Sequence, residues 1–227
     1  QGAEMIATGH YAQTDGKNLL KAADENKDQT YFLYRISEEV IPKTIFPVGG
    51  MTKPEVKKLA EEVGLTVAHK PESMGVCFVG EANMKDFLGE FIETRPGEIR
   101  ELESDKVLGM HDGAIFYTLG QRHGLGLKTG LPYYVVRKDM DKNIVYVSRN
   151  LNSLSLWKKE IELKDIIIRG DFDLSNLQAR IRHRAQLVSA KLEGKKLIFA
   201  DEQKSLTPGQ SVVLYSGDIC IGGGIIA

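Results

Sequence analysis

The fold of the last third of this sequence is decided by the stretch Ser211-Val212-Val213-Leu214-Tyr215-Ser216-Gly217-Asp218-Ile219-Cys220-Ile221-Gly222-Gly223-Gly224-Ile225-Ile226. Two short apolar segments flank Ser216-Gly217-Asp218, a combination typical of a tight turn between strands. Further short segments of this kind precede it, at 161–168, 179–192 and 197–200, with Glu193-Gly194-Lys195 as another turn. Five or six short strands at this spacing predict a small β-barrel.

The first part of the chain has a different pattern. Met5-Ile6-Ala7-Thr8, ended by Gly9-His10, is typical of a strand in a parallel sheet, and it indicates that the sequence begins within a domain. Helices are expected over 27–36, from Thr52 to Gly64, and over 82–94. The second has the strongest signal, because Thr52 and Glu55 form a capping-box pair around Pro54.

A third sequence pattern, of short strands separated by turns, follows Pro96-Gly97. His111-Asp112-Gly113 and Asp141-Lys142-Asn143 supply turns between these strands. We therefore expect an α/β remnant to about residue 81, a mixed central module to about residue 150, and a β-barrel to the end.

Composition limits the kinds of protein to which this chain can belong. The 227 residues are 42% hydrophobic and 27% charged, as in soluble globular proteins, and the net charge of −1 leaves nucleic-acid binding to local patches. No apolar run approaches ~18 residues, and no signal peptide is visible, so we expect no membrane association and a cytoplasmic protein. Cys77 and Cys220 are too few for a disulfide framework or a four-cysteine zinc site.

Cys77 is the candidate reactive group. It lies in Ser73-Met74-Gly75-Val76-Cys77-Phe78-Val79-Gly80, where glycines on both sides let backbone approach the sulfur. The same pattern is typical of a buried structural cysteine, and nothing nearby in the sequence lowers the pKa of the thiol. Cys220, between Ile219 and Ile221, is expected in the core.

Candidate contacts to a phosphate-bearing ligand lie at three places. Lys27-Asp28-Gln29 opens an expected helix, whose amides and lysine suit phosphate, although a solvated first turn with Asp28 favouring the helix dipole is the commoner explanation of such a tripeptide. His10 follows a strand, where ligands often bind, or is structural. Thr118–Gly126 places Arg122 among glycines, but it matches no dinucleotide or Walker A motif and is equally typical of a surface loop.

Alternating arginines form the most informative pattern. A strand through 179–187 would place Arg180, Arg182 and Arg184 on one face, with His183 on the other. Their spacing of roughly 6.5–7 Å is close to that of successive phosphates, so a phosphate-tracking stripe is predicted. Positive side chains also protect outer strands from edge pairing, and that alternative stays open.

Taken in chain order, these pieces closely resemble one family, the tRNA-specific 2-thiouridylases. The resemblance covers essentially the whole chain and is carried by Ala7-Thr8-Gly9-His10-Tyr11, Lys27-Asp28-Gln29-Thr30-Tyr31-Phe32-Leu33, Phe46-Pro47-Val48-Gly49, Gly75-Val76-Cys77-Phe78-Val79-Gly80, Tyr117-Thr118-Leu119-Gly120-Gln121-Arg122, Thr207-Pro208-Gly209-Gln210 and Gly222-Gly223-Gly224-Ile225-Ile226.

The resemblance implies a fold and an activity. It implies the C-terminal part of an ATP-pyrophosphatase domain over 1–81, a central tRNA-binding domain over 82–150 and a C-terminal β-barrel over 151–227. It also implies that ATP, with Mg²⁺, adenylates the 2-oxygen of the wobble uridine in tRNA and that a cysteine persulfide, loaded by a sulfur-donor protein, delivers sulfur. The family's pyrophosphate loop and second cysteine lie upstream and do not occur in these 227 residues, so we expect the chain alone to be inactive.

The resemblance also assigns residues. Cys77 is similar to the persulfide-bearing cysteine and Gly9 to an ATP-site residue, and no metal ligand is visible. The residues similar to tRNA contacts are His10, Lys27, Asp28, Gln29, Arg182, His183 and Gln210.

Three positions depart from the family pattern. His183 stands where tyrosine is usual, His123 replaces a lysine, and Tyr133 replaces a tryptophan. Two alternatives stay open: a non-catalytic tRNA-binding fragment with a structural Cys77, and a thiol redox protein, which the absence of a CxxC motif disfavours.

Overall fold

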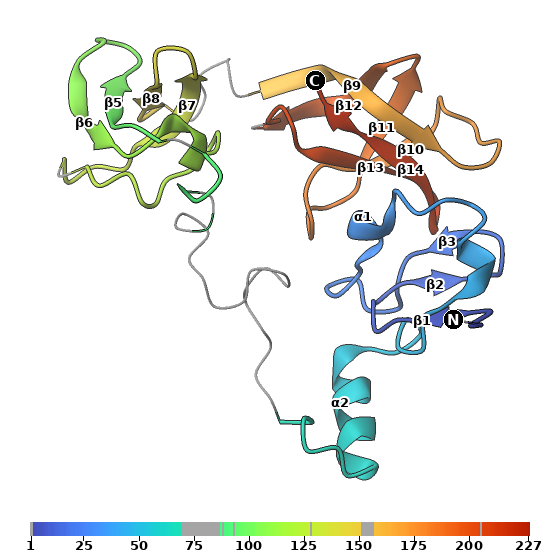
Figure 1. Ribbon diagram of the computed structural model, residues 1–227. Helices are drawn as coiled ribbons and strands as arrows, with labels where there is room; N and C mark the ends of the chain where they lie inside the picture. The colour runs from blue at the N-terminus through green and yellow to red at the C-terminus, as the bar shows by residue number, and fades with distance from the viewer. Residues whose placement is uncertain are drawn as a thin grey trace. The chain divides into compact units, whose positions relative to one another are not determined.

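The computed structural model describes residues 2–69, 87, 89–92, 94–127, 129–150, 157–204 and 206–227. Its elements are labelled in Figure 1. Residues 1–70, 159–203 and 208–227 form one compact unit, called here the barrel unit. Residues 71–158 and 204–207 form a second, the central unit.

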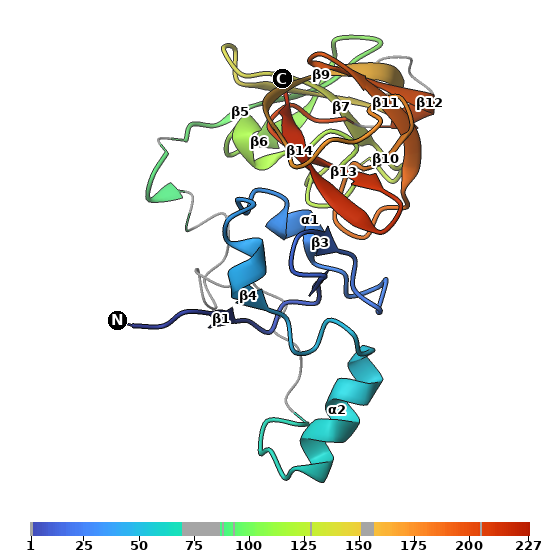
Figure 2. The same ribbon diagram turned by 90° about the vertical axis from the view of Figure 1, so that its right-hand side faces the viewer.

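A closed barrel dominates the barrel unit and confirms the predicted fold class. Its strands are β9 (Trp157–Ile168), β10 (Leu177–Arg180), β11 (Val188–Glu193), β12 (Lys196–Lys204), β13 (Ser211–Ser216) and β14 (Ile219–Ile226). They are hydrogen-bonded in the order β13-β10-β11-β12-β9-β14, and pairing of β13 with β14 closes the ring (Figure 2).

The glycines of β14 permit this closure. A Cβ on Gly222 would lie 1.9 Å from the carbonyl oxygen of Ile167, and one on Gly223 would lie 2.3 Å from that of Val212. Strand β14 runs between β13 and β9, and side chains at these two positions would separate it from both neighbours. Glycine at 222 and 223 is therefore a packing requirement.

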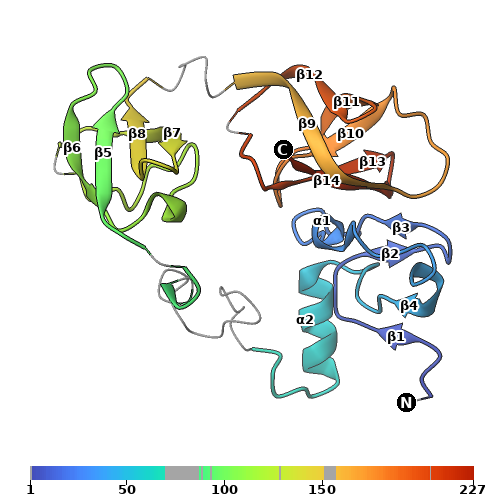
Figure 3. The same cartoon turned by 45° about the horizontal axis from the view of Figure 1, so that its top comes forward.

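The N-terminal part of the chain extends the barrel sheet. Strand β1 (Ile6–Ala7) pairs in parallel with β4 (Thr44–Ile45), as expected for a remnant of an α/β domain. Strands β2 (Gln13–Thr14) and β3 (Leu19–Leu20) form a hairpin, and β3 pairs with β14, so these strands continue the barrel sheet (Figure 3).

The predicted capping box is confirmed. Helix α2 spans Lys53–Glu62, with Thr52 and Glu55 exchanging hydrogen bonds at its start, and Gly64 follows its end with a φ of +71°. A 3-10 turn at Ile41–Lys43 precedes β4.

One core joins the N-terminal segment to the barrel. Tyr34 packs with Tyr215 and Cys220 in a single buried cluster. The guanidinium of Arg169 donates hydrogen bonds to the carbonyl oxygens of Tyr34, of Ile36 at 3.1 Å and of Cys220 at 2.6 Å. The domain boundaries expected at residues 81 and 150 stay predictions, but the first and last expected domains share this interior.

Two predicted elements were wrong in extent. The strand expected over 179–192 is interrupted, because β10 ends at Arg180 and β11 begins at Val188. The helix expected over 27–36 shrinks to α1, Thr30–Leu33. In both places polar tertiary contacts override the local pattern. The helix expected over 82–94 falls mostly outside the described residues.

The central unit holds a mixed sheet. Its strands are β5 (Gly97–Glu101), β6 (Val107–His111), β7 (Tyr134–Asp139) and β8 (Ile144–Ser148), in the order β6-β5-β8-β7 with β5 and β8 parallel. Ile99, Val135 and Val145 are fully buried in its core, beside a 3-10 turn at Ala114–Phe116. The turn expected at Asp141-Lys142-Asn143 joins β7 to β8.

Candidate nucleic-acid interface

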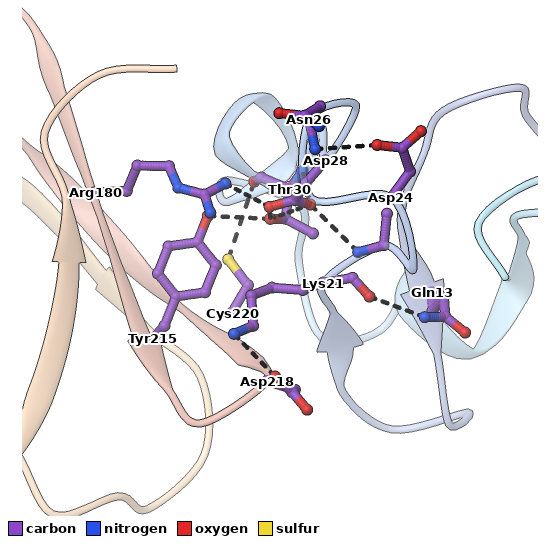
Figure 4. A network of polar contacts seen from close by, with 11 residues as sticks. Gln13, Lys21, Asp24, Asn26, Asp28, Thr30, Arg180, Tyr215, Asp218 and Cys220 are labelled. Carbon is purple, nitrogen blue, oxygen red and sulfur yellow. Dashed lines mark hydrogen bonds and ion pairs between the residues drawn. The ribbon is translucent and has the colours of Figure 1, made fainter. Parts of the chain in front are cut away.

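A buried ion pair joins two segments that are far apart in the sequence. Asp28 precedes α1, and Arg180 is the last residue of β10. The Nη1 of Arg180 lies 2.5 Å from Oδ2 of Asp28, and both side chains are almost fully buried (Figure 4). This contact brings the segment containing residues 27–29 beside the turn that follows Arg180.

Asp28 is the centre of a larger polar network. Its carboxylate accepts hydrogen bonds from the amide of Thr30 at 3.1 Å, from the hydroxyl of Thr30 at 2.8 Å and from the amide of Ala22 at 3.4 Å. The hydroxyls of Thr30 and Tyr215 lie 3.0 Å apart. The long helix expected to begin at Lys27 does not form there, since α1 is a single turn and its first amide is bound internally, whereas phosphate binding by residues 27–29 stays a prediction.

Aromatic rings connect α1 to the same turn. The ring of His183 lies 4.6 Å from that of Phe32 and 6.1 Å from that of Tyr31. Phe32 is 58% exposed, although it sits beside buried residues. These three rings, called here the aromatic cluster, present an aromatic face of the kind on which unpaired bases stack.

The surroundings of His183 favour its neutral form, because they lower the pKa of its ring. Burial, together with the charges of Arg184 and Arg180, lowers the pKa of His183 below its ordinary value, while Asp28 opposes the shift. Its Nδ1 is buried and has no hydrogen-bond partner among the residues that the structure describes. A neutral ring is suited to stacking rather than to pairing with phosphate.

The predicted arginine stripe is corrected by this geometry. Arg180 faces the interior and pairs with Asp28, so it does not belong to an exposed row. Arg182 and Arg184 are exposed, but they lie in the turn after β10, where Arg184 has a left-handed φ of +63°. Arg182 directly precedes His183 of the aromatic cluster in the sequence, and its charge opposes the rise that burial causes in the pKa of Tyr31.

Gln29 and His10 are both connected to Tyr11. Gln29 forms hydrogen bonds with the backbone of Tyr11, and His10 directly precedes Tyr11 in the sequence. The amide of Tyr11 donates to Oε1 of Gln29 at 2.8 Å, and the amide of Gln29 donates to the carbonyl of Tyr11 at 2.8 Å. His10 is partly buried, and its Nδ1 is hydrogen-bonded to the hydroxyl of Thr8 at 2.7 Å. Both predicted residues therefore belong to one locally ordered segment.

Gln210 is connected to α1 by the residue that follows it, Ser211. Its carbonyl accepts a hydrogen bond from the amide of Ile226 at 2.9 Å, which fixes the backbone. The carbonyl of the adjacent Ser211 accepts one from the hydroxyl of Tyr31 at 2.8 Å. Gln210 is therefore one residue from a direct contact with the aromatic cluster.

A cavity of about 550 Å³ opens beside the ion pair. Its walls come from the hairpin of β2 and β3, from the segment before α1 and from the turn after β10. Among its lining residues are Gln13, Asn26, Asp28, Arg180, Arg184 and Gln186. The mixed lining of amides and paired charges offers donors and acceptors without a strong net charge.

Gly9, the predicted ATP-site residue, lies on an open part of the surface. This residue is exposed after β1, and nothing lies within 4 Å of the place where its Cβ would stand. The backbone at Gly9 is therefore accessible to a ligand. Across the described ranges, no group of three or more His, Cys, Asp or Glu side chains could hold a metal ion.

Of the two cysteines, one is outside the described residues. That one is Cys77, so its predicted role stays a prediction. Cys220 is buried as expected, and burial raises the pKa of its thiol to about 11. No described helix is long and apolar enough to cross a membrane.

The sequence pattern does not predict the buried position of Arg180 or the ring contacts of Tyr31 and Phe32 with His183. Alternation predicts Arg180 on an exposed row, and the helix expected over 27–36 predicts no contact between its aromatic residues and residue 183.

Three family models match consecutive parts of the chain. Residues 1–81 match a family model described as a tRNA methyl transferase HUP domain, and residues 85–149 match a tRNA methyl transferase PRC-barrel domain. Residues 165–226 match an aminomethyltransferase beta-barrel domain.

Individual relatives are similar along nearly the whole chain. The tRNA-specific 2-thiouridylase MnmA of Listeria welshimeri is 43% identical over 238 residues, covering 99% of this chain and 64% of the relative. The protein of that name in Pediococcus pentosaceus is 42% identical over 248 residues, covering 99% of this chain and 65% of the relative. The chain therefore belongs to the tRNA-specific 2-thiouridylase family and spans about 64% of the length of its curated relatives.

Proposed function

We propose that this chain provides the tRNA-binding surface and one sulfur-carrying cysteine of an enzyme that transfers sulfur to the 2-position of the wobble uridine in tRNA. One observation gives the strongest support to the proposed tRNA-binding surface. The segment with Lys27 and Gln29 and the turn with Arg182 and His183 lie together in the barrel unit, joined by the Asp28–Arg180 pair.

The surface has the chemistry of a reader of single-stranded RNA. A uridine must leave the base stack before its 2-position can be reached, and unstacked loop bases bind aromatic faces beside basic groups. Tyr31, Phe32 and His183 supply rings, and Arg182 adds a charge next to them. Since the net charge of the chain is −1, this local grouping would have to steer the RNA.

Sulfur transfer is assigned to Cys77. ATP would supply the leaving group by adenylating the 2-oxygen, and the exposed backbone of Gly9 is the described position that would lie against it. The terminal sulfur of a Cys77 persulfide attacks C2, and the activated oxygen departs. A second thiol then attacks the Cys77 sulfur, breaking the S–S bond and forming a disulfide, while the transferred sulfur stays on the base.

Cys220 is unsuited to be that second thiol. It is 1% exposed, and burial raises its pKa to about 11, so little thiolate forms near neutral pH. The second thiol would therefore belong to a part of the enzyme outside these 227 residues.

Persulfide mapping tests the sulfur-carrying role. The chain is incubated with a cysteine desulfurase and free cysteine, and added sulfur is located by peptide mass spectrometry. We expect it on Cys77 and not on Cys220, with none on Cys77→Ser. A persulfide-free Cys77 in a chain that still binds tRNA would select the alternative, a non-catalytic tRNA-binding protein.

Product analysis separates thiolation from methylation, which the family-model descriptions mention. Nucleosides from tRNA treated with the full-length enzyme are identified by mass spectrometry. We expect 2-thiouridine, lost in Cys77→Ser and kept in Cys220→Ser. A methylated uridine in its place would contradict the proposal.

A further inference from the structure

The burial of the Asp28–Arg180 ion pair is not explained by a contribution of this pair to the stability of the fold. The side chain of Asp28 is 1% exposed and that of Arg180 is 9% exposed. Removing two charges from water is expensive, and apolar residues of similar size often stabilise a fold at least as well. Arg180 also keeps a buried Nε that has no hydrogen-bond partner within the described part of the chain.

The pair connects two groups of residues proposed to contact tRNA. Lys27 and Gln29 flank Asp28 directly in the sequence. Arg182 and His183 follow Arg180 after one residue. Strand β10, which Arg180 ends, is held on both sides by β11 and β13, so the ion pair attaches the segment before α1 to a rigid support.

The orientation of the Asp28 carboxylate argues against a contact between this group and RNA. Its oxygens are occupied by Arg180, by Thr30 and by the amide of Ala22. In Figure 4 the carboxylate points toward Thr30 and the guanidinium of Arg180, inside the barrel unit. A carboxylate would also repel phosphate if it were turned outward.

We propose that Arg180 is a positioning residue for tRNA binding, and that Asp28 acts through Arg180 rather than by touching RNA. This inference rests on the proposed function and deepens it. The ion pair fixes the separation between Lys27 and Gln29 on one side and Arg182 and His183 on the other. The free chain then presents both groups in the arrangement that the RNA requires, so less ordering is needed on binding.

The main test replaces both partners. Asp28→Asn with Arg180→Met removes the two charges together and leaves no unpaired buried ion, which is the change that a fold tolerates best. Affinity for a tRNA anticodon stem-loop is measured from low to moderate salt, at a temperature where circular dichroism shows every variant folded. We expect roughly 10-fold weaker binding with an unchanged salt slope.

The salt slope separates positioning from direct binding. If Arg180 itself neutralised a phosphate, its replacement would lower the slope by about one unit, and that result would overturn the positioning role. Binding by the double variant that equals that of the unmodified chain would overturn it as well. Lys196→Met, which breaks an exposed 3.1 Å pair with Glu160 on the barrel, is the matched control and should change neither quantity.

Single variants provide a second readout. Arg180→Lys keeps the charge and should restore most of the affinity, whereas Arg180→Met and Asp28→Asn should each weaken binding about as much as the double variant, because each breaks the same connection. Losses that add in the double variant would indicate two independent contacts and contradict the proposal.

If the variants do not fold, chemical labelling of the unmodified chain tests the inference instead. Carbodiimide coupling of an amine labels accessible carboxylates, and we expect label on the exposed Glu25 but not on Asp28, with or without RNA. Labelling of Asp28 that RNA blocks would overturn the inference. Absence of RNA binding by the unmodified chain would instead remove the proposed function, and the inference with it.

Discussion

The ring of His183, in the turn after β10, lies 4.6 Å from the ring of Phe32 in α1. This contact links the barrel to the N-terminal segment, which the buried hydrogen bonds of Asp28, Thr30 and Tyr215 also join. Phe32 remains 58% exposed in this contact, so the pair leaves an aromatic face open to solvent. An exposed ring held in place by a second ring is a natural platform for a base.

We expect Phe32→Ala and His183→Ala each to weaken binding of the anticodon stem-loop by about 1–3 kcal/mol, since each removes a stacking surface. The salt slope should stay constant, because no charge is removed. His183→Tyr should bind at least as well as the unmodified chain. Leu59→Ala, at an exposed apolar position on α2, is the control and should have no effect. Normal binding by both alanine variants would remove the stacking role.

Acid should destabilise the barrel unit through His183. Burial, with the charges of Arg184 and Arg180, holds the pKa of His183 below its ordinary value, so the unfolded chain takes up the proton more readily than the folded chain. The stability that depends on a neutral His183 is complete above the unfolded pKa of about 6.5, and it is lost as the pH falls from there toward the folded pKa.

Denaturant unfolding at about pH 8 and about pH 5.5 measures this effect. The loss of unfolding free energy between the two values should be smaller in His183→Phe than in the unmodified chain. Equal losses in the two proteins would show that His183 does not titrate differently on folding. His111 in the central unit, whose pKa burial also lowers, contributes equally to both proteins and cancels in the comparison.

Barrel closure should depend on Gly222. A Cβ there would meet the carbonyl oxygen of Ile167 at 1.9 Å, and the φ of +142° is itself unfavourable for a residue with a side chain, so Gly222→Ala should cost about 3 kcal/mol of unfolding free energy. Gly217→Ala is the matched control: this turn glycine has a φ of +58° and no atom within 4 Å of a Cβ, so only the backbone conformation is strained, at about 1 kcal/mol. Similar losses at the two positions would contradict the proposed close approach of β14.

Local signals predicted the regular elements well. Alternation and turn residues predicted the barrel strands around Ser216-Gly217-Asp218, and the Thr52–Glu55 pair predicted the start of α2. These features depend on neighbours in the sequence, and sequence patterns report such neighbours directly.

Long-range polar contacts explain the failures. Alternation through 179–187 predicted an exposed Arg180, but the carboxylate of Asp28 draws this side chain inward and the strand ends there. The same contact, with the hydrogen bonds of Gln29 to Tyr11, shortens the helix expected from residue 27. Neither partner can be identified from local periodicity, because the contact joins residues 152 positions apart.

The central claim is that the turn after β10, the segment before α1 and Gln210 beside β13 form one tRNA-binding surface. The most direct measurement is the salt dependence of anticodon stem-loop binding by the unmodified chain, by Arg182→Ala and by Gln210→Ala. We expect Arg182→Ala to weaken binding and to lower the salt slope by about one unit, because the variant no longer neutralises one phosphate. Gln210→Ala should weaken binding with the slope unchanged. An unchanged slope and affinity in Arg182→Ala would contradict the account.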